Sequence, residues 1–318
     1  MAKIENYTFD SCDDEGTKIH AVKWTPDDGK AKAAIELCHG MIEYIERYGE
    51  FAEFLADRGF AVFGHDHIGH GESVKDQSDL GNLHTDTPSK TVIEDMFTQY
   101  KLMREQYPSL PCFILGHSMG SYLLRKMLSV HANGLSKLSG AIIMGTGTEN
   151  DLAISIGTMI VKKSIKKNGR DFKSPSVAKL MFGPAYKNFD ITGADPAKSW
   201  LSKNVESVKK YYSDPKDTFM FSVNGYLLLL ECTKFDNNIE NIKKIRKDLP
   251  ILFVSGSDDP VGGLSKGVSA AYQKFVNAGI EDVTLKLYEN DRHELLQETD
   301  RQQVFSDIYD WMEKRMKQ

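Results

Sequence analysis

Apolar residues along this chain gather in short runs, and most runs are followed by a polar or glycine-rich stretch and then by apolar residues at helical spacing. The runs predict buried strands, and the helical spacing predicts helices that pack on them. The strand-like runs are residues 33–37, 60–63, 113–116, 140–144, 251–254 and 283–288. Strands that alternate with helices in this way are typical of an α/β fold, in which a mostly parallel sheet has helices on both faces.

Two local signals refine this prediction. Residues 5–12 and 18–26 carry apolar side chains on either side of an Asp-Asp-Glu-Gly turn, so we expect an antiparallel pair of strands at one edge of the sheet. Thr91 and Glu94 have the spacing of a capping box, in which the threonine caps the first turn of a helix and the glutamate bonds back to it. We therefore expect a helix to begin at Thr91.

The alternation of strand and helix is interrupted once. It stops near residue 149 and resumes at residue 251, and the interval shows helical spacing without a convincing strand. We interpret residues 150–231 as a helical cap inserted into an α/β core that consists of residues 1–149 and 232–318. The chain is long enough to bury one large core together with such an insertion.

The first part of the predicted cap is amphipathic. Its apolar side chains recur at helical spacing, and basic side chains crowd its C-terminal end. The apolar set is Leu152, Ile156, Met159 and Ile160, and the basic set is Lys162, Lys163, Lys166, Lys167 and Arg170. We expect the apolar set to cover an acyl channel and the basic set to point outward. The simplest interpretation of the basic set is a solvated helix face, and contact with an anionic membrane surface is the alternative.

Composition and charge narrow the class of protein. The chain has 41% hydrophobic and 27% charged residues, an ordinary composition for a globular protein, and no apolar run approaches the roughly 18 residues of a membrane span. The N-terminus has no apolar signal core and the four cysteines are dispersed, which favours a cytoplasmic protein with reduced thiols. A net charge of -5 argues against nucleic acid as a partner. The sequence does not define an oligomeric state.

Residues 116–120, Gly-His-Ser-Met-Gly, carry the chemistry. They lie between a predicted strand and a predicted helix, as in a nucleophile elbow, where a strained turn exposes the serine. Larger side chains at either end of the motif would strike the neighbouring strand and helix, which accounts for both glycines. Ser118 is therefore the candidate nucleophile. The amides of Met119, at the start of the helix, and of Met41, in the loop after strand 33–37, are the candidate oxyanion donors.

A serine hydroxyl needs a base, and the base needs an acid that fixes its tautomer. With an elbow of this kind, the order along the chain is serine, acid, histidine. His293 follows the predicted strand 283–288 and is the only one of the nine histidines that lies beyond the candidate acids. Asp258 and Asp259 follow strand 251–254. Adjacent side chains at a strand end point to opposite sides, so only one can reach the histidine, and we favour Asp259.

Two patterns in the sequence could suggest a metal site. His65, Asp66, His67 and His70 are spaced along a glycine-rich turn, where no helix holds two of them on one face. Residues 293–297 begin like the zinc motif H-E-x-x-H, but the fifth residue is glutamine, so the second metal ligand is missing. The sequence therefore predicts neither a metal nor a cofactor.

Five segments, in this order, resemble the monoacylglycerol lipase and lysophospholipase branch of the α/β-hydrolases, which sits in the serine aminopeptidase-like hydrolase family. The segments are residues 39–48, 66–73, 116–120, 256–259 and 288–293. The resemblance implies an eight-stranded α/β-hydrolase fold. It also implies a triad of Ser118, Asp259 and His293, with an oxyanion hole formed by the amides of Met41 and Met119.

The resemblance further implies that Glu43 and Arg47 lie near the glycerol end of the substrate. The chain departs from the family pattern at two positions that are usually glycine, since it has Ile42 after the His-Gly pair and Ser121 after the elbow. These departures leave the predicted triad intact and bear on the specificity for the acyl and alcohol groups.

The sequence thus predicts a serine hydrolase that cleaves carboxylic esters through an acyl-enzyme, with monoacylglycerols, lysophospholipids or related single-chain lipids as substrates. One alternative keeps the triad and cleaves amides, as an aminopeptidase with Glu206 or Asp214 holding the free amino terminus. Another alternative is a ligand-binding protein of the same fold without activity. Contact with a membrane through the cap would make the cytoplasmic protein a peripheral one.

Overall fold

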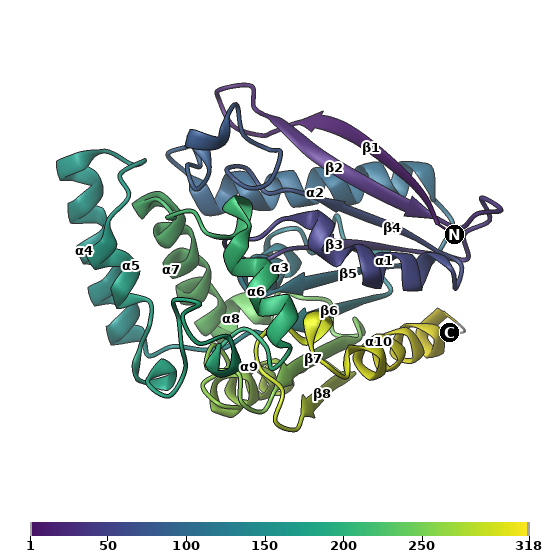
Figure 1. The fold of residues 1–318 in the computed structure, drawn as a ribbon. Helices are drawn as coiled ribbons and strands as arrows, with labels where there is room; N and C mark the ends of the chain where they lie inside the picture. Colours follow the sequence, from purple (N-terminus) through teal and green to yellow (C-terminus); the bar gives the residue numbers. More distant parts are fainter. Residues whose placement is uncertain (1, 317–318) are drawn as a thin grey trace.

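The computed structural model describes residues 2–316, and its centre is a single eight-stranded sheet (Figure 1). The strands are β1 (Lys3–Asp10), β2 (Lys18–Thr25), β3 (Ala33–Cys38), β4 (Phe60–His65), β5 (Cys112–His117), β6 (Gly140–Met144), β7 (Ile251–Gly256) and β8 (Val283–Tyr288). Their order in the sheet is β1-β2-β4-β3-β5-β6-β7-β8. β2 pairs antiparallel with both β1 and β4, and the other neighbours are parallel. The mostly parallel sheet with an antiparallel edge is therefore confirmed.

Helices cover both faces of the sheet. They are α1 (Gly49–Ala56) and α10 (Arg301–Met316) on one face, and α2 (Pro88–Gln106), α3 (Met119–Val130) and α9 (Lys266–Asn277) on the other. β5 illustrates the packing, because Ile114 belongs to the apolar cluster on one face while Phe113 and Leu115 belong to the cluster on the other. Side chains alternate along a strand, so a strand that is buried on both faces has a continuous apolar sequence.

One predicted helix start is wrong. Helix α2 begins at Pro88, not at Thr91, and Thr87 is its N-cap residue. Proline is favoured in the first turn because its φ is already helical. The N–H group that proline lacks would have no acceptor within the helix at this position. Thr91 is buried within the helix, and its hydroxyl lies 2.9 Å from the hydroxyl of Thr85.

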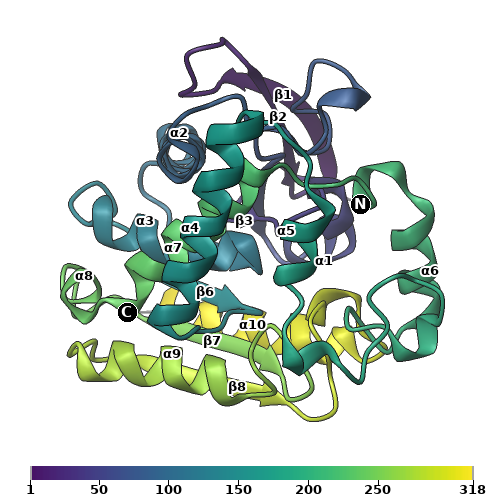
Figure 2. The ribbon, with the colours of Figure 1, turned by 90° about the vertical axis from the view of Figure 1, so that its left-hand side faces the viewer.

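The cap interval folds into helices that lie at one end of the molecule. They are α4 (Asp151–Asn168), α5 (Pro175–Leu180), α6 (Val205–Ser213) and α7 (Val223–Asn237), and α8 (Ile239–Ile242) leads back to the sheet. α4 packs along α7 on the outer side (Figures 1 and 2), and a Cβ added to Gly157 would lie 3.3 Å from the side chain of Leu230. The boundary predicted between residues 231 and 232 falls inside α7, which is one continuous helix.

The apolar row of α4 does not face the core. Ile154 and Val161 are the buried residues of this helix. The predicted channel-covering set is exposed, with exposed fractions of 69% for Leu152, 46% for Ile156, 64% for Met159 and 36% for Ile160. The expectation for this set is wrong because α4 turns a different face toward α7. Within residues 2–316, the helices fall short of the length and apolarity that crossing a membrane requires.

Candidate active site

The turn between β5 and α3 has the geometry of a nucleophile elbow. Ser118 has φ 51° and ψ -120°, a conformation that costs energy for a residue with a side chain. A Cβ on Gly116 would overlap the carbonyl of Gly120, and a Cβ on Gly120 would overlap the carbonyl of Cys38. Both glycines are therefore required by close backbone contacts, as the sequence predicted.

His293 and Asp259 meet at the ends of neighbouring strands. Asp259 follows β7 and His293 follows β8, and the His293 Nδ1 lies 3.0 Å from the Asp259 Oδ2. Both side chains are buried, and the other carboxylate oxygen of Asp259 accepts a hydrogen bond of 2.8 Å from the amide of Val261. Asp258 is exposed, and its carboxylate accepts from the Ser257 hydroxyl. The structure thus brings Asp259, and not Asp258, to the histidine.

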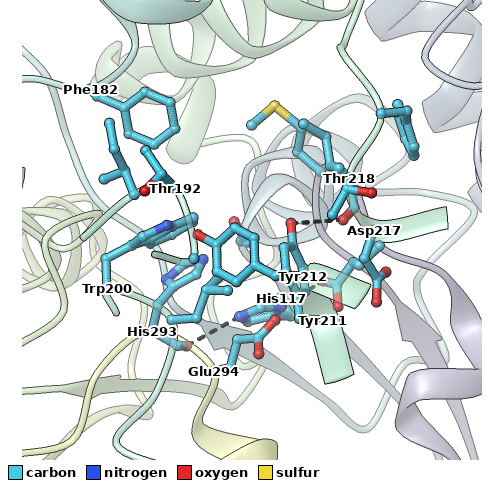
Figure 3. A pocket seen from close by; sticks show the side chains of 18 of the residues that line it. His117, Phe182, Thr192, Trp200, Tyr211, Tyr212, Asp217, Thr218, His293 and Glu294 are labelled. Carbon is cyan, nitrogen blue, oxygen red and sulfur yellow. Dashed lines mark hydrogen bonds and ion pairs between the residues drawn. The ribbon is translucent and has the colours of Figure 1, made fainter. Parts of the chain in front are cut away.

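The second nitrogen of His293 faces the same cavity as Ser118. This Nε2 has no hydrogen-bond partner among the described residues, and both side chains line one pocket of about 770 Å³ (Figure 3). The ring of Trp200 stacks on the imidazole of His293 at 5.1 Å between centroids and 29° between planes. The imidazole of His293 is therefore held between the carboxylate of Asp259 and the ring of Trp200.

The candidate oxyanion donors flank the elbow. Met41 lines the pocket, and Met119 is the first residue of α3, where helix N–H groups have no acceptor within the helix. The backbone of Gly40 approaches the nucleophile closely, since a Cβ there would lie 2.9 Å from the Cβ of Ser118. The nearby Ile42 has φ 58°, which is strained for a β-branched residue.

Glu43 and Arg47 belong to a buried network next to His117. Glu43 lies 2.9 Å from both the His117 Nδ1 and the Tyr48 hydroxyl, and Arg47 donates to it at 3.0 Å. Burial alone would raise the pKa of Glu43, but His117 and Arg47 hold it well below the usual range. Glu43 lines the pocket, whereas Arg47 is not among the described residues that line it. Substrate contact by Arg47 stays a prediction, and the observed contacts point to an indirect role.

Three residues at the pocket could not be identified as functional from the sequence. Trp200 left no signal in the sequence, because nothing distinguishes it from a core tryptophan. Glu294 follows His293 directly and was weighed only as part of a failed zinc motif, yet it forms two hydrogen bonds to Arg47, of 2.7 and 2.9 Å. Asp217 is buried and lines the pocket, three positions beyond Asp214.

The pocket has an apolar side and an acidic side. Figure 3 shows Phe182 and Trp200 across the pocket from Asp217 and Thr218. Residues 182–219 of the cap interval supply most of the cover. Helix α4 contributes no lining residue within the described chain, so the pocket is closed by the second half of the cap.

A group of buried histidines lies at the end of β4 and in the loops that follow β3 and β4. His39, His65, His67 and His70 are fully buried, and the amide of His67 donates to the His39 Nε2 at 2.8 Å. Burial, with a smaller contribution from His39, lowers the pKa of His65 and of His70 to about 3. These rings are therefore neutral packing groups at neutral pH.

Comparisons with known proteins agree with this geometry. Monoglyceride lipase from Homo sapiens is 28% identical over 95% of this chain and 88% of its own length, and the enzyme from Rattus norvegicus is 26% identical over 95% and 89%. A thermostable carboxyl esterase from Bacillus coagulans, solved in complex with glycerol, superimposes with a TM-score of 0.88 at 26% identity and covers 98% of this chain and 99% of that one. These likenesses confirm the α/β-hydrolase fold. Since the family description "Serine aminopeptidase, S33" also matches residues 29–300, the chain belongs to the serine aminopeptidase S33 family.

Proposed function

We propose that this protein is a serine hydrolase that cleaves single-chain carboxylic esters, with monoacylglycerols as the main substrates. One observation carries the proposal: Ser118 sits on a strained elbow in the same pocket as the free Nε2 of His293, whose other nitrogen is bound by buried Asp259. Backbone strain at Ser118 and an unpaired buried nitrogen on His293 both cost stability, and such costs are typical of functional sites.

In the proposed reaction, the Ser118 Oγ attacks the carbonyl carbon of the ester while the His293 Nε2 takes the hydroxyl proton. Asp259 holds the imidazole tautomer and stabilises its charged form. The amides of Met41 and Met119 bind the oxyanion. The bond to the alcohol oxygen then breaks, and the alcohol leaves with the proton from His293. Water repeats these steps on the acyl-enzyme and releases the carboxylic acid and free Ser118.

The substrate class follows from the relatives and from the pocket. Two relatives that match 95% of this chain are monoglyceride lipases, and the pocket of about 770 Å³ has an apolar side suited to an acyl chain. We also propose that residues 150–231 act as the cap that selects the substrate, since residues 182–219 cover the pocket. No cofactor takes part in the proposed reaction.

The two alternatives are not favoured. An aminopeptidase would need Glu206 or Asp214 at the pocket, but Glu206 pairs with Lys209 on the surface and Asp214 accepts a hydrogen bond from Tyr44. Neither is among the described residues that line the pocket. An inactive binding protein would not need the buried pair of Asp259 and His293 beside a strained serine.

The proposed function is tested by a panel of substrates. It consists of p-nitrophenyl esters from C2 to C16, a monoacylglycerol, a lysophospholipid and an aminoacyl anilide. We expect turnover of the esters and the monoacylglycerol and no cleavage of the anilide. Faster cleavage of the anilide than of every ester would contradict the proposal.

We further propose that the outer face of α4 contacts anionic membranes. Leu152, Ile156 and Met159 are exposed on this helix, and its C-terminal half carries exposed lysines. These are Lys162, Lys163, Lys166 and Lys167. An exposed apolar row next to basic side chains suits the boundary between lipid headgroups and acyl chains. Arg170 does not join this surface, because it pairs with Asp86 and Glu15.

A further inference from the structure

Asp217 is a buried carboxylic acid with a free oxygen at the pocket. Its side chain is 3% exposed and lines the cavity. The Oδ2 lies 3.4 Å from the Arg47 Nε, but the Oδ1 has no hydrogen-bond partner within residues 2–316. A buried polar oxygen without a partner is unfavourable, and the proposed catalytic steps do not use this residue. The free oxygen therefore points to a partner that the substrate supplies.

The groups around Asp217 leave it without a counter-charge of its own. Arg47 donates to Glu294 at 2.7 and 2.9 Å and to Glu43 at 3.0 Å. Burial lowers the pKa of His117, but the charge and hydrogen bond of Glu43 together with the charge of Glu294 raise it overall. Arg47 is thus shared by three acidic side chains, Glu43, Glu294 and Asp217. Burial raises the pKa of Asp217 to about 8, although Arg47 opposes the rise.

The pocket offers no free cation to an anionic substrate. Its ionisable lining residues, tyrosines apart, are Glu43, Asp217, Glu294, His117 and His293, and no described lysine or arginine lines it. A phosphate group placed here would be desolvated beside carboxylates without a counter-ion. A hydroxyl group suits the site in either protonation state, because it can donate to an ionised Oδ1 or accept from a protonated one.

We propose that Asp217 binds a hydroxyl group on the alcohol part of the substrate and thereby selects neutral polyol esters over phosphate-bearing ones. The inference rests on the proposed ester hydrolase function and specifies the alcohol that this pocket takes. The acyl chain then lies against Phe182 and Trp200, on the opposite side of the pocket (Figure 3). Within the proposed substrate class, the site favours monoacylglycerols over lysophospholipids.

The test compares four substrates that share one acyl chain: a monoacylglycerol, the ethyl ester, a lysophosphatidylglycerol and an acylcholine. The wild-type protein should show its highest kcat/KM with the monoacylglycerol. Asp217→Ala should lower the ratio of monoacylglycerol to ethyl ester hydrolysis about tenfold, the effect of losing one good hydrogen bond. Asp217→Asn should keep most of that ratio, because an amide also donates and accepts.

Glu206→Gln is the matched control, since it removes a cap carboxylate that pairs with Lys209 on the surface, and its substrate ratios should equal those of the wild type. If the wild-type protein cleaves esters but Asp217→Ala leaves the ratio unchanged, the inference is overturned while the proposed function stands. A preference for the acylcholine would also overturn it, because the acidic group would then bind a cation. If the folded wild-type protein cleaves none of the four esters, the proposed function itself is overturned. Asp217→Leu keeps a side chain of similar size without a hydrogen-bonding group, so its ratios decide the question if Asp217→Ala does not fold.

Discussion

The carboxyl ends of the central strands and the cap above them are held in different ways. β5 and β7 are buried at every position, and the side chains of Asp259 and His293 are almost completely buried. α4 has two buried residues, Ile154 and Val161, over its 18 positions. The site residues on the strand ends are therefore fixed by the core, whereas the outer cap is fixed by one packing face.

We relate this difference to two roles, catalysis at the strand ends and substrate selection in the cap. In the proposed function, the strand ends supply the nucleophile, the base and the acid in a geometry that the core determines. The cap supplies the apolar wall and Asp217, whose Oδ1 has no hydrogen-bond partner among the described residues. Changes at the strand ends should therefore abolish turnover of every ester. Changes in the cap should alter the preference among esters or the binding to membranes.

The largest effect is expected at the strand ends. Ser118→Ala and His293→Ala should each lower kcat by about 10⁴- to 10⁶-fold for every ester, because the members of a triad act as a unit. Circular dichroism and the unfolding midpoint should confirm that the variants fold. Turnover above about a tenth of the wild-type rate in folded Ser118→Ala would rule out this nucleophile.

The two adjacent aspartates provide a matched pair. Asp259→Asn should lower kcat by about 10⁴-fold, since an amide facing the His293 Nδ1 favours the wrong tautomer. Asp258→Asn should have little effect, because the side chain is exposed. The reverse ranking in steady-state kinetics would assign the acid to Asp258.

Much of the core could be predicted from the sequence, because its constraints are local. The apolar runs gave the strands, and the glycines around Ser118 reflect backbone contacts that no other residue satisfies. The cap was less predictable. An apolar row such as that from Leu152 to Ile160 shows that a helix has an apolar face, but only the tertiary structure shows that this face points outward. Asp217 could not be identified from the sequence because its contact with Arg47 joins residues that are far apart along the chain.

Charge reversal on α4 should affect membrane contact more than catalysis. Replacing Lys162, Lys163, Lys166 and Lys167 with glutamate should weaken binding to anionic vesicles by up to about 10³-fold at low salt, since each basic residue near such a surface contributes about 1 kcal/mol. Hydrolysis of a soluble short-chain ester should change little. The measurement is vesicle sedimentation at low and high salt. Salt screens the attraction between the lysines and the anionic lipids, so the difference between the two proteins should shrink at high salt. Equal binding by both proteins would mean that the lysines form an ordinary solvated face.

Acid should weaken the core through the buried histidines. The folded pKa values of His65 and His70 are about 3, below the roughly 6.5 of an unfolded chain. Their contribution is therefore fully present above about pH 6.5 and is lost as the pH falls toward 3, by about 1.4 kcal/mol per pH unit for each histidine. The free energy of unfolding, measured with denaturant from pH 7 to 4, should show this slope. His65→Gln should lower the slope by the contribution of one proton, about 1.4 kcal/mol per pH unit. An unchanged slope would contradict the buried neutral state.

The most direct test of the account is covalent labelling of the intact protein with a fluorophosphonate, followed by mass spectrometry and peptide mapping. The strand-end geometry predicts one equivalent of label on Ser118, slower labelling in His293→Ala and none in Ser118→Ala. Labelling of a different residue, or no labelling of the folded wild-type protein, would contradict the claim that Ser118, His293 and Asp259 form a working nucleophilic site.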